Sequence, residues 1–210
     1  MHISARTGVI NNNQVAATAF AVEVAEMVEA TTGHAINLWS VIYGMPLGTL
    51  TWSTQVESFA ETSVMETKLM ENADYVAKVT EAGQNGLFIP GSFENHIARI
   101  VHAAGEPGAT EYVSTISATA VTGKMHEALA FATSISDYAA AATGGANMVG
   151  VSNYGTPGLI TWFAGYPGPE AVEAAQEALA GDAGYQAKIA ESADLFLAGS
   201  AQTTLARRIR

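Results

Sequence analysis

Residues 35–43 read AINLWSVIY, a β-branched and aromatic run that is typical of a strand. Three apolar side chains alternate onto one face of this strand: Ile36, Leu38 and Ile42. Four more alternate onto the other face: Ala35, Trp39, Val41 and Tyr43. A sheet built from such strands must be covered on both faces, because exposed apolar surface costs free energy in water. One layer of helices covers only one of them.

The residues around this strand predict the element order β-α-β-β-α-β. A helix over 14–31 is indicated by the absence of glycine and proline and by Gly33 just beyond its end. Apolar residues at helical spacing predict a second helix over 58–82. The remaining predicted elements are strands over 3–10, 35–43 and 49–56, a turn over 44–48, and a last strand within 87–102.

The second half of the chain repeats the first. At an offset of 111 residues, Ala19-Phe20-Ala21 matches Ala130-Phe131-Ala132 and Tyr43-Gly44 matches Tyr154-Gly155. The offset falls to 110 for Thr51-Trp52 and Thr161-Trp162, and to 108 for Ala98-Arg99 and Ala206-Arg207. The same elements are therefore predicted over 112–121, 124–142, 146–154, 159–164, 169–192 and 195–210.

This duplication predicts the domain organisation and the fold class. We expect a first unit over 1–104, a linker over 105–110 that contains Gly105, Pro107 and Gly108, and a second unit over 111–210. Each unit is an α+β, ferredoxin-like βαββαβ unit, with an antiparallel sheet and two helices on one face. The second repeat supplies the sheet that covers the other face of the first. The two tandem units are therefore expected to pack as a pseudo-dimeric α+β barrel.

With this order and duplication, the chain resembles the dimeric α+β barrel superfamily. That superfamily includes antibiotic-biosynthesis monooxygenases, NIPSNAP-like proteins, stress-responsive barrel proteins and the haem-binding chlorite dismutase group. The first two are nearest in kind. The resemblance covers both halves, but it rests on element order and not on a family motif, so it carries more about fold than about function.

Composition excludes several functional classes. The chain is acidic, with a formal net charge of −11, and nine Lys and Arg against twenty Asp and Glu cannot easily supply a nucleic-acid-binding face. Anionic membranes are disfavoured for the same reason. With no cysteine, neither disulfides nor thiolate metal sites can form.

Charged residues make up only 14% of the chain, which favours a large buried interface and hence a homo-oligomer. The N-terminal sequence lacks the pattern of a secretory signal, and no apolar run is long enough to span a bilayer. We therefore expect a cytoplasmic protein.

The candidate binding residues lie on and around the predicted strand over 35–43. Asn37, Trp39 and Tyr43 share one face of it. The resemblance to cofactor-free oxygenases implies a pocket lined by Asn, Trp, Tyr and Arg side chains that holds a phenolate or enolate. Trp52 and Arg99 are added as a lining residue and an anion clamp. The alternative is that Trp39, Tyr43 and Trp52 are packing residues and that Arg99 pairs with a helix acid.

The corresponding strand of the second unit has diverged: Met148, Gly150 and Tyr154 stand opposite Asn37, Trp39 and Tyr43. Such divergence would suit one working pocket and one that has lost its function.

Histidine spacing argues against a metal. None of the five histidines forms an H-x-H or H-x-x-x-H pair, so neither a metal nor another cofactor is expected. A lone axial histidine to haem, such as His96 or His126, stays open as a minor alternative.

The sequence thus predicts a protein that binds a small apolar or aromatic molecule. The activity that we expect is that of a cofactor-independent monooxygenase on an aromatic or polyketide-like substrate. The alternative is a non-enzymatic, self-assembling structural protein that forms a higher-order homo-oligomer.

Overall fold

The computed structural model describes residues 1–152 and 154–210, and within them it contains eight strands and six helices. The first repeat comprises β1 (His2–Val9), α1 (Gln14–Thr32), β2 (Asn37–Tyr43), β3 (Thr49–Val56), α2 (Phe59–Glu71), α3 (Ala73–Gln84) and β4 (Glu94–Ala104). The second comprises β5 (Tyr112–Thr119), α4 (Met125–Thr143), β6 (Ala146–Ser152), β7 (Leu159–Tyr166), α5 (Pro169–Gly181), α6 (Ala183–Glu191) and β8 (Gln202–Arg208).

The strand pairs whose register the structure describes are antiparallel, and the same pairing recurs in both repeats. In the first, β3 lies between β1 and β2; in the second, β7 lies between β5 and β6. The hydrogen-bonded strand order is β1-β3-β2-β8-β5-β7-β6-β4, which is that of a closed barrel. The predicted α+β fold class, with its antiparallel barrel of tandem units, is thereby confirmed.

The chain divides into two compact units, and the last strand of each repeat crosses between them. Unit 1 comprises residues 1–97 together with 208–210, and unit 2 comprises residues 98–207. The chain passes from one unit to the other within β4 and again at the end of β8. Unit 1 therefore receives its last three residues from the far end of the sequence.

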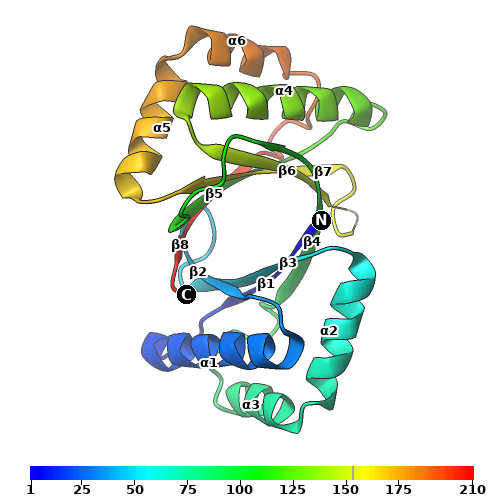
Figure 1. Cartoon of the computed structure of the whole chain (residues 1–210), viewed down its shortest axis with the longest axis vertical. Coiled ribbons are helices and arrows are strands. Elements are labelled where there is room, and N and C mark those ends of the chain that lie inside the picture. The colour runs from blue at the N-terminus through cyan, green and yellow to red at the C-terminus, as the bar shows by residue number, and fades with distance from the viewer. Residues whose placement is uncertain (153) are drawn as a thin grey trace. The chain divides into compact units, whose positions relative to one another are not determined.

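The core of unit 1 lies between its sheet and α1, which covers one face of β2 and β3 (Figure 1). Leu38 is fully buried there, and Trp52 packs against Phe88 with their ring centroids 6.0 Å apart. The Trp52 indole Nε1 also donates a hydrogen bond to the Ala21 carbonyl of α1 at 2.9 Å. Sheet and helix are thus joined by one aromatic anchor.

Unit 2 repeats this anchor. Trp162 donates from Nε1 to the Ala132 carbonyl of α4 at 3.1 Å. The centroid of its ring lies 5.7 Å from that of Phe196. Three matched pairs of residues, Trp52 and Trp162, Ala21 and Ala132, and Phe88 and Phe196, thus reproduce one local arrangement, which is what a duplicated sequence predicts.

The second helix of each repeat differs from its prediction. A single helix was expected over 58–82, but Asn72 adopts an extended backbone, with ψ at 102°, and separates α2 from α3. Its side-chain oxygen accepts from the Tyr75 N–H at 3.1 Å, so the break is capped and costs little. Asp182 separates α5 from α6 in the same way, where one helix over 169–192 was expected.

Among the described residues, none of the helices combines the length and the apolar character that a membrane crossing requires.

Candidate functional site

The two faces of the unit 1 sheet differ in chemistry. Alternation along β2 turns Leu38 toward α1, so its neighbours Asn37 and Trp39 lie on the face without helices. Their cross-strand partners on β3 are Ser53 and Thr51. This helix-free face therefore carries hydroxyl, amide and indole groups, whereas the α1 side is apolar.

Trp39 is the centre of this face. Its side chain is largely buried, at 8% exposure, and its Nε1 donates to the Ser53 Oγ at 2.8 Å. The guanidinium carbon of Arg208 lies 5.2 Å from the centroid of the indole ring, a cation–π distance. Arg208 also donates from Nη2 to the Asn37 Oδ1. We call these four residues, Asn37, Trp39, Ser53 and Arg208, the Trp39 site.

Arg208 is available to an anion. Among the residues that the structure describes, no carboxylate forms an ion pair with it, although the chain has twenty acids against nine Lys and Arg. A guanidinium has five N–H donors, and Asn37 occupies one of them. The Trp39 ring and the Asn37 side chain orient the guanidinium, and its other N–H groups can donate to a ligand. That combination suits a carboxylate, a phenolate or an enolate.

The equivalent positions of unit 2 are apolar. The repeat offsets put Met148, Gly150, Phe163 and Ile100 where unit 1 has Asn37, Trp39, Ser53 and Arg208. A Cβ on Gly150 would lie 3.1 Å from Phe163 Cε2 and 3.4 Å from Ile100 Cδ1, so neighbouring side chains fill that space. The large aromatic group has moved from β2 in the first repeat to β7 in the second. The cation is absent from this set of positions.

The five predicted site residues are only partly brought together. Asn37 and Trp39 lie side by side on the Trp39 site. Tyr43 is at the end of β2 and is 68% exposed, and Trp52 points to the opposite face, into the α1 core. Arg99 is exposed on the part of β4 that belongs to unit 2, opposite Val151.

The sequence analysis missed two members of the site, Ser53 and Arg208. Arg208 falls in a C-terminal basic cluster with Arg207 and Arg210, in which residue type alone does not distinguish one arginine from the others. A usable signal was the repeat itself, because Arg208 stands where the first repeat has the apolar Ile100.

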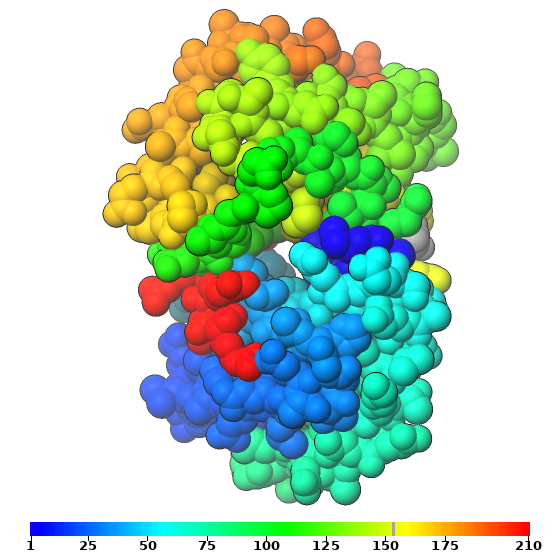
Figure 2. Space-filling view, viewed as in Figure 1, coloured from blue at the N-terminus to red at the C-terminus, as the bar shows by residue number. Residues whose placement is uncertain are grey.

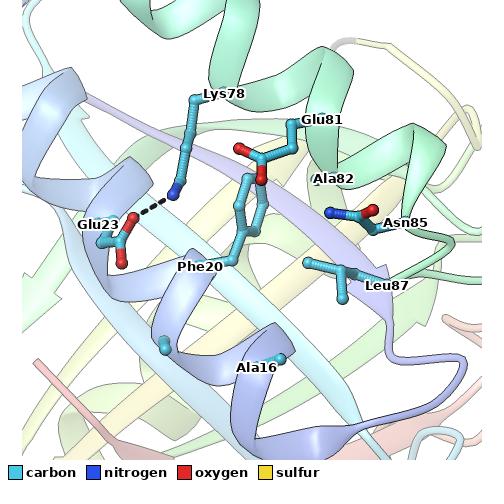
Figure 3. A pocket seen from close by; sticks show the side chains of 9 residues that line it. Ala16, Phe20, Glu23, Lys78, Glu81, Ala82, Asn85 and Leu87 are labelled. Atoms are coloured by element: carbon cyan, nitrogen blue, oxygen red, sulfur yellow. Dashed lines mark ion pairs between the residues drawn. The ribbon is translucent and has the colours of Figure 1, made fainter.

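A pocket with a volume of about 250 Å³ lies between α1 and α3 of unit 1, away from the Trp39 site (Figure 3). Phe20 and Leu87 form its apolar floor, and Lys78 reaches across it to Glu23. The hydrogen bond from Lys78 to Glu23 raises the pKa of that lysine. Because Lys78 is already paired with Glu23, we interpret this pocket as part of the packing between α1 and α3.

A hydrogen-bonded aspartate of unit 2 links two of its helices. The Tyr138 hydroxyl donates to Asp182 Oδ1 at 2.8 Å, and the Tyr185 N–H donates to the same oxygen at 2.8 Å. The backbone bond from Tyr185 and then the Tyr138 bond lower the pKa of Asp182, and the bond to Asp182 raises the pKa of Tyr138. This carboxylate caps α6 and ties it to α4, so its role is structural.

Within residues 1–152 and 154–210, no three His, Asp or Glu side chains gather in a group that could hold a metal ion.

The chain is similar in structure to several solved proteins. A candidate monooxygenase from Fusobacterium nucleatum subsp. nucleatum aligns with a TM-score of 0.73 at 7% identity, over 100% of this chain and 92% of that one. An anthrone oxidase-like protein aligns at 0.66 and 12% identity, over 100% and 91%. A candidate monooxygenase from Lactobacillus acidophilus aligns at 0.66 and 11% identity, over 99% and 93%.

At these identities the likeness establishes a shared fold. No protein-family model matches the sequence, and a search of curated proteins gives no match. The expected kinship with NIPSNAP-like proteins stays a prediction.

Proposed function

We propose that the chain binds a small anionic aromatic ligand on the Trp39 site and acts on it as a cofactor-independent monooxygenase. The observation that carries this proposal is the guanidinium of Arg208, which lies 5.2 Å from the Trp39 ring centroid and forms no ion pair with any carboxylate that the structure describes. The structural likeness to candidate monooxygenases and to an anthrone oxidase-like protein supports the reaction class.

The residues suit a phenol, or an enol of polyketide type. A nearby guanidinium favours the ionised form of such a group, because opposite charge lowers the pKa of an acid. The indole of Trp39 offers a flat surface for an aromatic ring. Asn37 and Ser53 set the positions of the cation and the indole through their hydrogen bonds. The site would thus concentrate the electron-rich anion that reacts with dioxygen.

In such a reaction the substrate supplies all four electrons that reduce dioxygen. The ring CH₂ group whose deprotonation gives the enolate becomes a carbonyl, so two C–H bonds break and one C=O bond forms. One atom of dioxygen enters the product, and the other leaves as water with the two hydrogens. The protein's part is to stabilise the anion and to hold it in a fixed orientation.

Anthrone is a suitable probe, since its oxidation by dioxygen gives anthraquinone and water. We expect the protein to accelerate anthraquinone formation, followed by absorbance, with a matching uptake of oxygen. Arg208→Ala should weaken anthrone binding by about tenfold or more, because a charge-assisted hydrogen bond contributes about 1.5–3 kcal/mol. The control Arg207→Ala removes a neighbouring exposed arginine and should leave binding unchanged.

Either of two results would count against the proposal. Equal losses in the Arg207 and Arg208 variants would mean that only net charge matters. If the protein binds anthrone tightly but does not accelerate its oxidation beyond the rate in buffer, the protein is a binding protein and not an oxygenase.

A non-enzymatic, self-assembling protein is the second candidate function, favoured by apolar side chains on the surface of unit 1. Leu47, in the β2–β3 turn, is 95% exposed, and Met70 of α2 is 64% exposed. The second repeat lacks a residue opposite Leu47 and has Thr156 opposite Met45. Native mass spectrometry distinguishes the two: a uniform high-order particle that Leu47→Ser disperses favours assembly, and a monomer excludes it.

A further inference from the structure

The last three residues of the chain are bound to β2 at the position of the Trp39 site. The Leu38 N–H donates to the Arg210 carbonyl at 3.0 Å, and the Ile209 N–H donates to the Leu38 carbonyl at 2.7 Å. Leu38 stands between Asn37 and Trp39, the two residues that contact Arg208. In Figure 2 this C-terminal end, in red, lies at the surface beside the blue residues of the first repeat.

A local irregularity turns Arg210 away from the direction of Arg208. The N–H groups of Ile209 and Arg210 both point to the Leu38 carbonyl, at 2.7 and 3.3 Å, which is the pattern of a β-bulge. A bulge redirects the side chain that follows it. Arg208 therefore lies against Trp39, whereas Arg210 reaches the C-terminal half of α1.

Arg210 is anchored there by several contacts. Its Nη2 donates to Glu29 Oε2 at 2.5 Å, its Nη1 donates to the Ile36 carbonyl at 3.3 Å, and its Nε lies 4.0 Å from Glu26 Oε1. The side chain is 30% exposed, so these contacts are partly shielded from water. No basic residue of α1 itself stands in the last turn, and Arg210 supplies the cation that a helix C-terminus favours.

We propose that Arg210 is a positioning residue for Arg208: its pairing with Glu29 fixes the C-terminal strand and so holds the Arg208 guanidinium over Trp39. This inference rests on the proposed function of the Trp39 site for its consequence, but its geometry belongs to unit 1 alone. Without the anchor, residues 208–210 are held to β2 only by the backbone hydrogen bonds at Leu38 and by the contacts of Arg208 itself. Arg208 would then spend part of its time away from the indole.

The first test needs no ligand. The indole N–H resonance of Trp39 reports the cation above its ring, so Arg208→Ala should move it. Arg210→Ala should move the same resonance part of the way toward its Arg208→Ala position, and Arg210→Lys should restore most of the difference. Arg207→Ala, a loss of equal charge, should leave it in place. An unmoved Trp39 resonance in Arg210→Ala would overturn the positioning role, whether or not the protein binds anthrone.

The second test is a double-mutant cycle on anthrone affinity. Arg210→Ala should weaken binding by about fivefold when Arg208 is present and by less than about twofold in the Arg208→Ala background, as coupled residues do. Equal losses in both backgrounds would mean that Arg210 acts on general stability and not through Arg208. If the native protein binds no anthrone, the proposed function fails, and the resonance experiment decides the inference by itself.

Discussion

Phe163 fills the space that a side chain at Gly150 would need: its Cε2 atom lies 3.1 Å from the place of a Gly150 Cβ. The Ala98 Cβ lies at the same distance on the neighbouring strand. In the first repeat, Trp39 stands at the position of Gly150 and Ser53 at the position of Phe163. The large residue is therefore on β2 in the first repeat and on β7 in the second, and an apolar contact replaces the hydrogen bond between Trp39 and Ser53.

Gly150→Ala should therefore destabilise the protein by about 1 kcal/mol net, since overpacking outweighs the entropy gained by replacing glycine. Urea unfolding measures the loss. Phe163→Leu should recover part of it by making room. Gly108→Ala, whose Cβ would meet nothing within 4 Å, should be close to neutral. A stabilised Gly150→Ala protein would mean that Phe163 and β4 move aside freely.

The same exchange predicts the binding stoichiometry. Because Met148, Gly150, Phe163 and Ile100 offer neither cation nor amide, one chain should bind one anthrone. Isothermal titration calorimetry should give a ratio near one, and Arg208→Ala should abolish the signal at the concentrations used. Ile100→Ala alters the matching position of the second repeat and should leave both affinity and ratio unchanged. A ratio of two would show that the second face is also a site.

Trp52 and Trp162 should contribute to stability and not to binding. Trp52→Phe removes the hydrogen bond to the Ala21 carbonyl and should cost about 1 kcal/mol. Trp162→Phe should cost a similar amount, because the bond to Ala132 is equivalent. Anthrone affinity should be unchanged in both variants. A large loss of affinity in Trp52→Phe would instead return Trp52 to the binding residues that the sequence suggested.

Asp182 should make the protein less stable in acid. Its pKa lies below the ordinary value of 3.8, so the carboxylate stabilises the fold above the ordinary carboxyl range, and this contribution is lost as pH falls through the lowered pKa. Asp182→Asn keeps a capping oxygen for the Tyr185 N–H but carries no charge. Its urea midpoint should therefore depend less on pH in the acid range than that of the native protein.

Asn72 provides the matched control in the first repeat, where an amide already caps Tyr75 at 3.1 Å. Asn72→Asp should acquire the acid sensitivity that Asp182→Asn loses.

Tyr138 acts at the other end of the pH scale. Its pKa is raised, so the neutral hydroxyl contributes stability that is lost as pH rises through that value, and Tyr138→Phe should flatten the alkaline limb. Parallel curves for all these variants would exclude the coupling.

Element order could be predicted because it depends on local properties. The two-faced apolar run of 35–43, the glycine after each first helix and the matched tryptophans each report on their immediate neighbours. The breaks at Asn72 and Asp182 were missed, since a capping side chain inside a long helical pattern resembles any other polar residue. Only the bonds of these residues to Tyr75 and Tyr185 reveal that a new helix begins there.

The sequence by itself determined the duplication, the βαββαβ order of each repeat and the face of β2 on which Asn37 and Trp39 lie, because these follow from periodicities of two and 3.6 residues. Only the tertiary structure decided which arginine reaches that face. Arg99 and Arg208 lie more than one hundred residues apart and are the same type of residue, and which of them lies against Trp39 depends on which strand end belongs to unit 1. Strand crossing depends on backbone hydrogen bonds between distant segments, and side-chain patterns carry little information about those.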